Sequence, residues 1–231
     1  MMDAVTTDEM TIGVLGGTGA QGRGLALRWA ASGLDVVLGS RDAERAEQAA
    51  AELNETLAGV EGAATVRGAA NRDASEAADV VLAAVPFDAH EKTLTDLVDV
   101  LDGKIVIDCV NPLGFDKQGP FVLPVEGGSA AEQAQTLLPG SRVIGAFHNV
   151  SAVILGDLSI TDVDTDVLVL GEDRDDVAVV VELADRIPGM RGLFGGRLRN
   201  AAQVEALTAN IIAINRRYKT HAGIRITGQG L

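Results

Sequence analysis

The stretch LGGTGAQGRGLALRWAASGLDVVLGSR, residues 15–41, decides the fold of this chain. The apolar run TIGVL at residues 11–15 leads into its glycines, and a second apolar run, DVVLG, follows at residues 35–39. Between the two runs, four apolar residues recur at the three- and four-residue spacing of one helical face: Leu25, Ala26, Trp29 and Ala30. This order of strand, glycine-rich turn, helix and strand predicts a βαβ unit.

The rest of the chain continues this alternation. A second helix is expected to begin at Asp42, which is a favourable N-cap residue. Further apolar strands are expected at residues 63–68, 79–85, 104–110 and 142–147. Continuous apolar strands separated by helical patterns are typical of a parallel sheet that is covered on both faces. We therefore predict an α/β fold with a Rossmann-type, doubly wound parallel sheet.

The glycines of the opening stretch predict a dinucleotide site. The spacing G-x-G-x-x-G is formed by six consecutive residues: Gly17, Thr18, Gly19, Ala20, Gln21 and Gly22. Gly17 is expected to make the tight turn, Gly19 to let the backbone approach a pyrophosphate, and Gly22 to let the helix pack close to the strand. Free N–H groups and the helix dipole would then attract the anion.

The end of the second strand indicates which dinucleotide is bound. Ligands lie outside the carboxyl ends of parallel strands, and the chain reads Gly39, Ser40, Arg41 there, with no acid to hold the ribose of NAD. Asp35 opens the strand at the opposite edge. We therefore expect Ser40, Arg41 and, one helical turn later, Arg45 to bind the 2′-phosphate of NADP. The alternative for Arg45 is an ion pair with acids along its own helix.

Residues at three further strand ends predict the rest of the site. Val85, Pro86 and Phe87 follow the fourth expected strand, Asn111 follows the fifth, and His148 follows the sixth. We expect them to converge on one crevice, in which Phe87 is either a wall of the nicotinamide pocket or an aromatic ring that caps the core. His148 has three interpretations: a proton donor, a hydrogen-bond partner of a bound ring, or a histidine satisfied at a strand end.

Neither an acid–base pair nor a metal site is expected beside these residues. The sole tyrosine, Tyr218, is followed directly by Lys219, so the Tyr-x-x-x-Lys pair of short-chain dehydrogenases is missing. The metal-binding residue types are too sparse and scattered to form a cluster. We interpret His90 and His221 as surface or structural residues, and the single cysteine, Cys109, as a buried thiol.

After Phe147 the pattern changes. One strand is expected at residues 166–171, then a helix, and then a long final helix with an apolar stripe formed by Val204, Leu207, Ile211, Ile214 and Tyr218. We predict a flexible tail at residues 1–10, an NADP-binding Rossmann domain at residues 11–147 and a small C-terminal α/β domain at residues 148–231 that ends in this helix.

Charge and hydropathy exclude several classes of protein. A formal charge of −14, from 33 acidic and 19 basic residues, argues against nucleic acid as a partner. A basic leader and an apolar run long enough for a bilayer are both missing, so we expect a cytoplasmic protein without membrane contact. Residues 186–225 contain eight basic residues and one acidic residue. This excess predicts an anionic ligand; the alternative is that these arginines pair with the acidic residues 171–176.

Five blocks of the sequence resemble the NADPH-dependent reductases of the deazaflavin coenzyme F420. They are GGTGAQGRGLALRWA, GSRDAERA, DCVNPLGFDKQGP, GAFHNVSA and RLRNAAQVEALTANIIAINRRYK. The first two blocks also occur in other nucleotide-binding proteins, whereas the last three are more distinctive. The likeness runs through nearly the whole chain after residue 10.

The resemblance implies hydride transfer between the nicotinamide of NADP and coenzyme F420, in a homodimer whose C-terminal domain carries the deazaflavin site and the dimer contacts. It implies that NADP is held by Thr18, Ser40, Arg41 and Arg45. It places Val85 and Pro86 on the nicotinamide side, and His148, Val150 and Ala152 beside the stacked rings. Because stacked rings need alignment rather than a general acid, we expect His148 and Val150 to align them without acid–base catalysis.

Three expectations stand beside this interpretation. The chain could instead be an NADPH reductase of an ordinary flavin or a ferric chelate. It could also be a non-catalytic NADP sensor, because GGTGAQG also fits the spacing G-x-x-G-x-x-G. For the anionic tail of coenzyme F420, we predict a contact with Arg191, Arg197 or Arg199.

Overall fold

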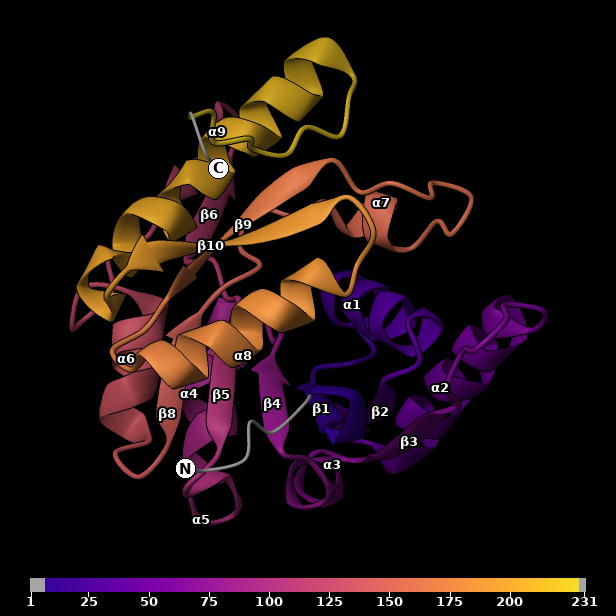
Figure 1. Cartoon of the computed structure of the whole chain (residues 1–231). Coiled ribbons are helices and arrows are strands. Elements are labelled where there is room, and N and C mark those ends of the chain that lie inside the picture. Colours follow the sequence, from indigo (N-terminus) through magenta and orange to yellow (C-terminus); the bar gives the residue numbers. More distant parts are fainter. Residues whose placement is uncertain (1–6, 229–231) are drawn as a thin grey trace.

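The computed structural model describes residues 7–228, which contain an eight-stranded sheet (Figure 1). In chain order its strands are β1 (Thr11–Leu15), β2 (Asp35–Ser40), β3 (Val66–Ala70), β4 (Val80–Ala83), β5 (Ile105–Asp108), β8 (Arg142–Gly145), β9 (Thr165–Leu170) and β10 (Met190–Gly196). Across the sheet they follow the order β10-β9-β8-β5-β4-β1-β2-β3. The strands from β3 to β8 pair in parallel and have the order of a doubly wound dinucleotide-binding sheet, which confirms the predicted fold class.

The strand ends differ from the sequence-based boundaries. β3 begins at Val66, three residues later than expected, whereas β4 ends at Ala83, β5 at Asp108 and β8 at Gly145, each two residues earlier. Val85, Pro86, Asn111 and His148 therefore lie in loops beyond the sheet edge, and Phe87 begins the helix that follows β4. The start of α2 (Ala43–Leu57) is as expected, because the Asp42 carboxylate accepts hydrogen bonds from two backbone N–H groups of its first turn.

The strands after residue 148 extend the same sheet. β9 joins β8 in antiparallel pairing at Gly145 and Leu170, and β10 runs parallel to β9. The C-terminal region thus continues the Rossmann sheet, and its long final helix is present as expected. The division of the chain into domains at residue 147 stays a prediction.

Helices cover both faces of the sheet (Figure 1). Besides α2 they are α1 (Ala20–Ala31), α3 (Asn71–Ala77), α4 (Phe87–Thr95), α5 (Val98–Leu101), α6 (Ala130–Leu137), α7 (Ala152–Leu155), α8 (Arg174–Asp185) and α9 (Ala201–Tyr218). One core packs α1, α2 and α8 and another packs α4, α5 and α6. Along β4, Val80 and Leu82 belong to the first core, whereas Val81 and Ala83 belong to the second. This alternation places the two cores on opposite faces.

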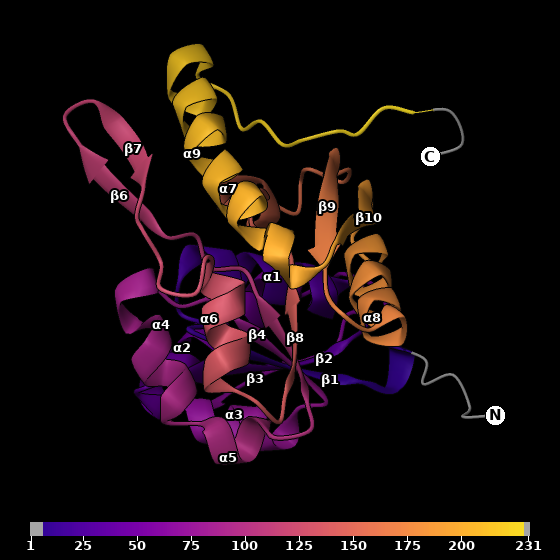
Figure 2. The ribbon, with the colours of Figure 1, turned by 90° about the vertical axis from the view of Figure 1, so that its left-hand side faces the viewer.

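A hairpin projects beyond the sheet beside α9 (Figure 2). It consists of β6 (Leu113–Asp116) and β7 (Gly119–Val122). The Asp116 carboxylate accepts hydrogen bonds from the backbone N–H groups of Gln118 and Gly119, and Gly119 closes the turn with a φ of 123°.

Only the first part of α9 is buried. Val204 and Ile211 are covered, as the apolar stripe predicts, but Ile214 and Tyr218 are 43% and 73% exposed. Phe115 and Phe121 of the hairpin are exposed as well. The hairpin and the end of α9 therefore carry an open apolar surface. Within residues 7–228, no helix combines the length and the hydropathy that crossing a membrane requires.

Candidate functional site

The glycine turn joins β1 to α1. Gly16 has a φ of 71°, and a Cβ there would lie 2.8 Å from the carbonyl oxygen of Ala84. The tight turn is thus made at Gly16, one residue earlier than expected, because this residue ends the strand in the left-handed conformation. Gly17 packs against β2 instead: its N–H donates to the carbonyl oxygen of Gly39 at 2.9 Å, and a Cβ would lie 2.8 Å from Leu38.

The start of α1 is open to an anion. Gly22 lets the helix pack against β1 as expected, because a Cβ there would lie 3.0 Å from Cγ1 of Val14. Gly19 and Ala20 are exposed, and the first turn holds no acidic residue and no side-chain cap. Free N–H groups at a helix N-terminus favour negative charge. The contact of these residues, with Thr18 beside them, to a pyrophosphate stays a prediction.

Ser40 and Arg41 line a cavity of about 520 Å³ at the carboxyl ends of β2 and β3. Its opposite wall holds Arg72 and Lys92, but each of these pairs with a nearby acid, at 2.8 and 2.7 Å. Among the residues described, Arg41 is the cation of this cavity without an acidic partner. An anionic group in the cavity would therefore find the Arg41 guanidinium available.

Arg45 and Asp35 lie outside this cavity. Arg45 is exposed on α2, and its contact with a 2′-phosphate stays a prediction. Asp35 stands at the opposite end of β2, as expected, where its carboxylate binds the hydroxyl of Thr11 at 3.0 Å and the guanidinium of Arg67 at 2.7 Å. Asp35 is thus a partner of Arg67 and not a ligand of a ribose at the carboxyl edge.

Residues from several strand ends meet in a crevice of about 590 Å³. Val85, Pro86 and Phe87 line it after β4, Asn111 lines it after β5, and Gln21 lines it from the first turn of α1. Val85, Pro86, Phe87 and Asn111 thus meet as predicted, but His148, which was expected to converge with them, does not line the crevice. Their contact with a cofactor stays a prediction.

The outer wall of the crevice was not apparent from the sequence. It is formed by α9 and the base and inner side of the hairpin: Leu113, Phe115, Leu123, Thr208 and Ile212. Thr208 is distinguished in the sequence only as a polar residue next to the apolar stripe of the last helix. Asp88, at the start of α4, lines both the crevice and the 520 Å³ cavity, so the two cavities meet at this residue.

Hydrogen bonds fix the floor of the crevice. The hydroxyl of Thr208 lies 3.0 Å from both Oδ1 of Asn111 and the carbonyl oxygen of His148, so its single hydrogen can serve either acceptor. Asn149 donates to the same hydroxyl at 2.8 Å, and the Asn111 amide donates to the His148 carbonyl oxygen at 3.1 Å. Two polar groups, from α9 and from the end of β5, are thus held together at the floor.

Phe147, two residues after the end of β8, turns the chain next to the first turn of α1 and has a φ of 63°. This left-handed conformation is unfavourable for a residue with a side chain, and such strain is common near ligand sites. The ring packs edge-on against Trp29 at a centroid distance of 5.5 Å, and the carbonyl oxygen accepts from the Gln21 amide at 3.2 Å. These contacts hold the strained residue in place.

The ring of His148 lies in the interior and does not line the crevice. It is 4% exposed, and neither ring nitrogen has a hydrogen-bond partner among residues 7–228. The interpretation as a histidine satisfied at a strand end is not supported, because neither ring nitrogen has a partner in this part of the chain. Burial lowers its pKa to about 4, so the ring is neutral at neutral pH. A role in ring alignment stays a prediction.

We expect acid to destabilise the protein through His148. The folded pKa of about 4 lies below the ordinary value of 6.5, so the unfolded chain binds more protons between these values. Stability from this residue is complete above pH 6.5 and is lost as pH falls toward 4, by roughly 3 kcal/mol. Urea unfolding of the wild type and of His148→Leu at pH 6.5 and at pH 4 measures how much unfolding free energy each protein loses on acidification. The variant should lose less stability on acidification, whereas His221→Leu, at an exposed histidine, should behave as the wild type.

Val150 and Ala152 follow His148 in the chain and lie away from the 590 Å³ crevice. Val150 lines a separate cavity of about 450 Å³ with Ser151, below residues 221–225. Ala152 begins α7, and its carbonyl oxygen would lie 3.5 Å from a Cβ at Gly24 of α1. Neither residue lines the 590 Å³ crevice, so their contact with a stacked ring stays a prediction.

A buried arginine of α1 holds α7. Arg28 is 4% exposed and donates to four backbone carbonyl oxygens at the end of α7 and just after it: Ile154 and Asp157 at 2.7 Å, Ile160 at 2.9 Å and Leu155 at 3.0 Å. The last carbonyl groups of a helix have no partner within the helix. The guanidinium therefore satisfies this end of α7 and fixes it against α1.

His90 and Cys109 are both buried. His90 is a structural residue and not a surface one: its Nε2 lies 2.6 Å from the carboxylate of Asp108. Cys109 lines the crevice, but its thiol donates to the carbonyl oxygen of Ala83 at 3.3 Å, and burial raises the pKa of the thiol. The interpretation of Cys109 as a buried thiol is confirmed. His221 is exposed.

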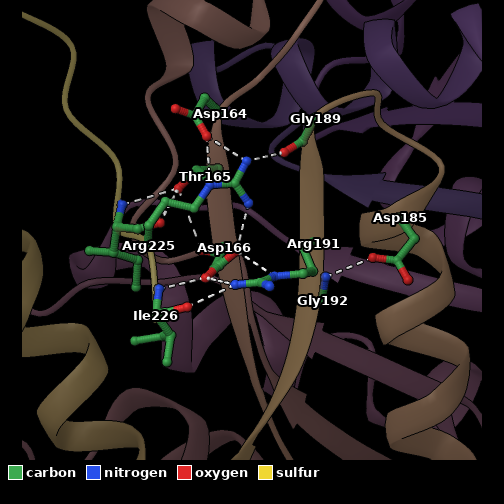
Figure 3. A network of polar contacts seen from close by, with 10 residues as sticks. Asp164, Thr165, Asp166, Asp185, Gly189, Arg191, Gly192, Arg225 and Ile226 are labelled. Atoms are coloured by element: carbon green, nitrogen blue, oxygen red, sulfur yellow. Dashed lines mark hydrogen bonds and ion pairs between the residues drawn. The ribbon is translucent and has the colours of Figure 1, made fainter. Parts of the chain in front are cut away.

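Four arginines of the basic segment pair with acids in the described part of the chain, and Figure 3 shows two of them, Arg191 and Arg225. Arg191 and Arg225 both bind Asp166, at 2.8 and 2.7 Å, and the bond from Arg191 holds the pKa of Asp166 well below its ordinary value. Arg197 pairs with Glu172 at 3.3 Å. The alternative, pairing with the acidic residues 171–176, therefore holds for Arg197 alone, because the other paired arginines bind acids elsewhere in the described chain. Because Arg191 is engaged in the fold, a contact of Arg197 or Arg199 with the deazaflavin tail stays a prediction.

Comparison with known proteins identifies the family of this chain. Residues 11–112 match the family described as "NADP oxidoreductase coenzyme F420-dependent". The chain is 44% identical over 223 residues to the F420-dependent NADP reductase of Methanothermobacter thermautotrophicus, covering 94% of this chain and 95% of the relative. It is 41% identical over 224 residues to the F420-dependent NADP reductase of Methanocaldococcus jannaschii, covering 94% and 98%.

A solved structure extends the likeness to three dimensions. The crystal structure of a putative F420-dependent NADP-reductase from Arthrobacter sp. FB24 superimposes with a TM-score of 0.79 at 28% identity, and covers 95% of this chain and 100% of that one. Identity of 41–44% to these two reductases, sustained along nearly the whole chain, shows that this chain belongs to the family of coenzyme F420-dependent NADP oxidoreductases.

Proposed function

We propose that this protein transfers a hydride between NADP(H) and coenzyme F420 by stacking the nicotinamide on the deazaflavin ring. The observation that carries the proposal is the pair of cavities that meet at Asp88. One contains Ser40 and the available Arg41, which suits a 2′-phosphate. The other is large enough for two rings and is lined mainly by apolar side chains. The two curated relatives are named for the same two cofactors.

The residues of the site bind, orient and exclude water. The nicotinamide supplies the hydride and the deazaflavin accepts it, or the reverse, when both are bound. Val85, Pro86 and Phe87 would form the wall behind the nicotinamide, and Asn111 and Thr208 offer an amide and a hydroxyl to ring substituents. Apolar residues around them keep water from the reacting faces. Hydride transfer between aligned rings needs no proton donor, in keeping with the neutral ring of His148.

Reduction of coenzyme F420 by NADPH tests the proposal. Mixing the purified protein with NADPH and oxidised coenzyme F420 should bleach the visible absorbance of the deazaflavin. The same assay with FMN and with a ferric chelate should give much slower oxidation of NADPH. Equal or faster rates with either acceptor would favour the alternative reductases, and NADPH binding without turnover of any acceptor would favour the sensor.

We also propose that the protein is a cytoplasmic homodimer. The open apolar surface of the hairpin and the end of α9, with Phe115 and Tyr218 at 68% and 73% exposure, supports self-association. The unpaired thiol of Cys109 suits a reducing compartment. Light scattering during size exclusion should give twice the 23.9 kDa of the chain.

A further inference from the structure

A buried polar network lies behind the crevice. His90 of α4 contacts Asp108 at the end of β5 through Nε2, at 2.6 Å, and Gln133 of α6 through Nδ1, at 3.1 Å. His90 and Asp108 are fully buried, and α6 packs against both α4 and α9. The network therefore connects α6 to two elements that line the crevice, the helix that begins at Phe87 and the strand end before Asn111.

Glu205 connects the third element, α9, to the same helix. It is 2% exposed, and its two carboxylate oxygens accept hydrogen bonds from the N–H groups of Ala130 and Ala131, at 3.0 and 3.1 Å. These N–H groups lie at the N-terminus of α6, where a negative charge is favoured by the helix dipole. Each bond is charge-assisted, and losing either would leave a buried donor without a partner.

Glu205 lies one helical turn before Thr208. Residues three apart lie on the same side of a helix, so the two side chains project from neighbouring positions of α9. Thr208 contacts Asn111 and the His148 carbonyl oxygen at the crevice floor, and Ile212 continues the wall one turn later. A shift of Glu205 relative to α6 would therefore move Thr208 relative to the end of β5.

We propose that Glu205 is a positioning residue. Its carboxylate fixes α9 against the N-terminus of α6, and this contact holds Thr208 beside Asn111 in the geometry that the deazaflavin ring requires. Glu205 itself lines neither the crevice nor the 520 Å³ cavity, so it acts through α9. Only the name of the ligand rests on the proposed function. The coupling between Glu205 and the crevice floor is a property of the fold alone.

The surroundings of Glu205 make this contact sensitive to pH. Burial raises the pKa of Glu205 to about 7, although the bonds from Ala130 and Ala131 favour the charged form. The charge of Asp108 also raises it, and His90 lowers it. Burial disfavours the charged form of His90, but its bonds to Asp108 and Gln133 outweigh burial and raise its pKa. As pH falls through 7, Glu205 takes up a proton and its hold on α6 weakens.

Nuclear magnetic resonance tests the coupling without any deazaflavin. In a pH titration of the ¹⁵N-labelled protein, the backbone amide signals of Ala130 and Ala131 should shift with a midpoint near pH 7. The side-chain amide signal of Asn111 should shift with the same midpoint, because Thr208 follows α9. In Glu205→Gln both shifts should vanish. Movement at Ala130 and Ala131 without movement at Asn111 would overturn the positioning role.

Kinetics test what the coupling does for the site. Glu205→Gln keeps the size of the side chain but sets an NH₂ group against one N–H donor, so the Michaelis constant for coenzyme F420 should rise about tenfold. The Michaelis constant for NADPH should change less than about twofold. NADPH is also held through its 2′-phosphate by Arg41, which lies in the 520 Å³ cavity away from Glu205. A purely structural role would lower the unfolding free energy and affect both cofactors alike. Glu91→Gln, the same change at an exposed residue of α4, is the matched control.

A double-mutant cycle identifies the route. If Glu205 acts through Thr208, the double variant Glu205→Gln, Thr208→Ala should raise the Michaelis constant for coenzyme F420 no more than the larger of the two single changes does. Additive effects would overturn the proposal. A protein that shows the coupled shifts of Ala130 and Asn111 but does not reduce coenzyme F420 would retain the positioning role and refute the proposed function instead.

Discussion

Arg41→Ala should raise the Michaelis constant for NADPH roughly 10- to 100-fold and leave that for NADH nearly unchanged. The guanidinium of Arg41 lies in the 520 Å³ cavity beside Ser40, and the other cations of that cavity are paired with acids. A bond from arginine to a phosphate is charge-assisted, and only NADPH carries a phosphate at this position. Initial rates at varied NADPH and NADH, with a fixed amount of coenzyme F420, measure the two constants.

Arg67→Ala is the matched control for this change. Arg67 is an arginine of the neighbouring strand, but it pairs with Asp35 at the opposite edge of the sheet. Its removal should leave both Michaelis constants unaltered. An equal rise for NADPH and NADH in Arg41→Ala would contradict the assignment of this cavity to the 2′-phosphate.

Arg28→Met should lower the free energy of unfolding by about 3 to 5 kcal/mol. The guanidinium is buried and donates to four carbonyl oxygens at and after the end of α7. Methionine fills much of the same space but offers no donor, so these carbonyl groups lose their partner. Urea denaturation followed by circular dichroism measures the loss.

Arg23→Met makes the same replacement elsewhere on α1. Arg23 pairs with Glu52 at 2.8 Å, and both side chains remain substantially exposed. Surface ion pairs contribute little, so this variant should lose less than about 1 kcal/mol. Similar losses in both variants would show that burial and the carbonyl contacts do not set the importance of Arg28.

The sequence was sufficient for those parts of the site that depend on local pattern. The glycine spacing after β1, the N-cap at Asp42 and the Ser40–Arg41 end of β2 are each determined within a few residues. Parallel topology then requires the ends of β4 and β5 to meet near them, which is why Val85 and Asn111 were assigned to one crevice. The exact residue of the turn was missed, because Gly16 and Gly17 are both glycines and only the backbone conformation distinguishes them.

Contacts between distant segments were beyond the sequence. Thr208 meets Asn111 across 97 residues and Glu205 meets Ala130 across 75, and helical periodicity indicates only which residues share a face. β10 was not expected, because its sequence MRGLFGG contains three glycines, which are uncommon in strands. Pairing with β9 overrides this weak propensity.

Cys109 can serve as a chemical probe of how often the crevice opens. It is the single cysteine of the chain, it lines the crevice, and its side chain is buried. A thiol reagent can reach it only when the surrounding segments separate, so the rate of alkylation reports how often they do. Protection of this thiol by either cofactor can therefore be followed by mass spectrometry on the unlabelled, unmutated chain.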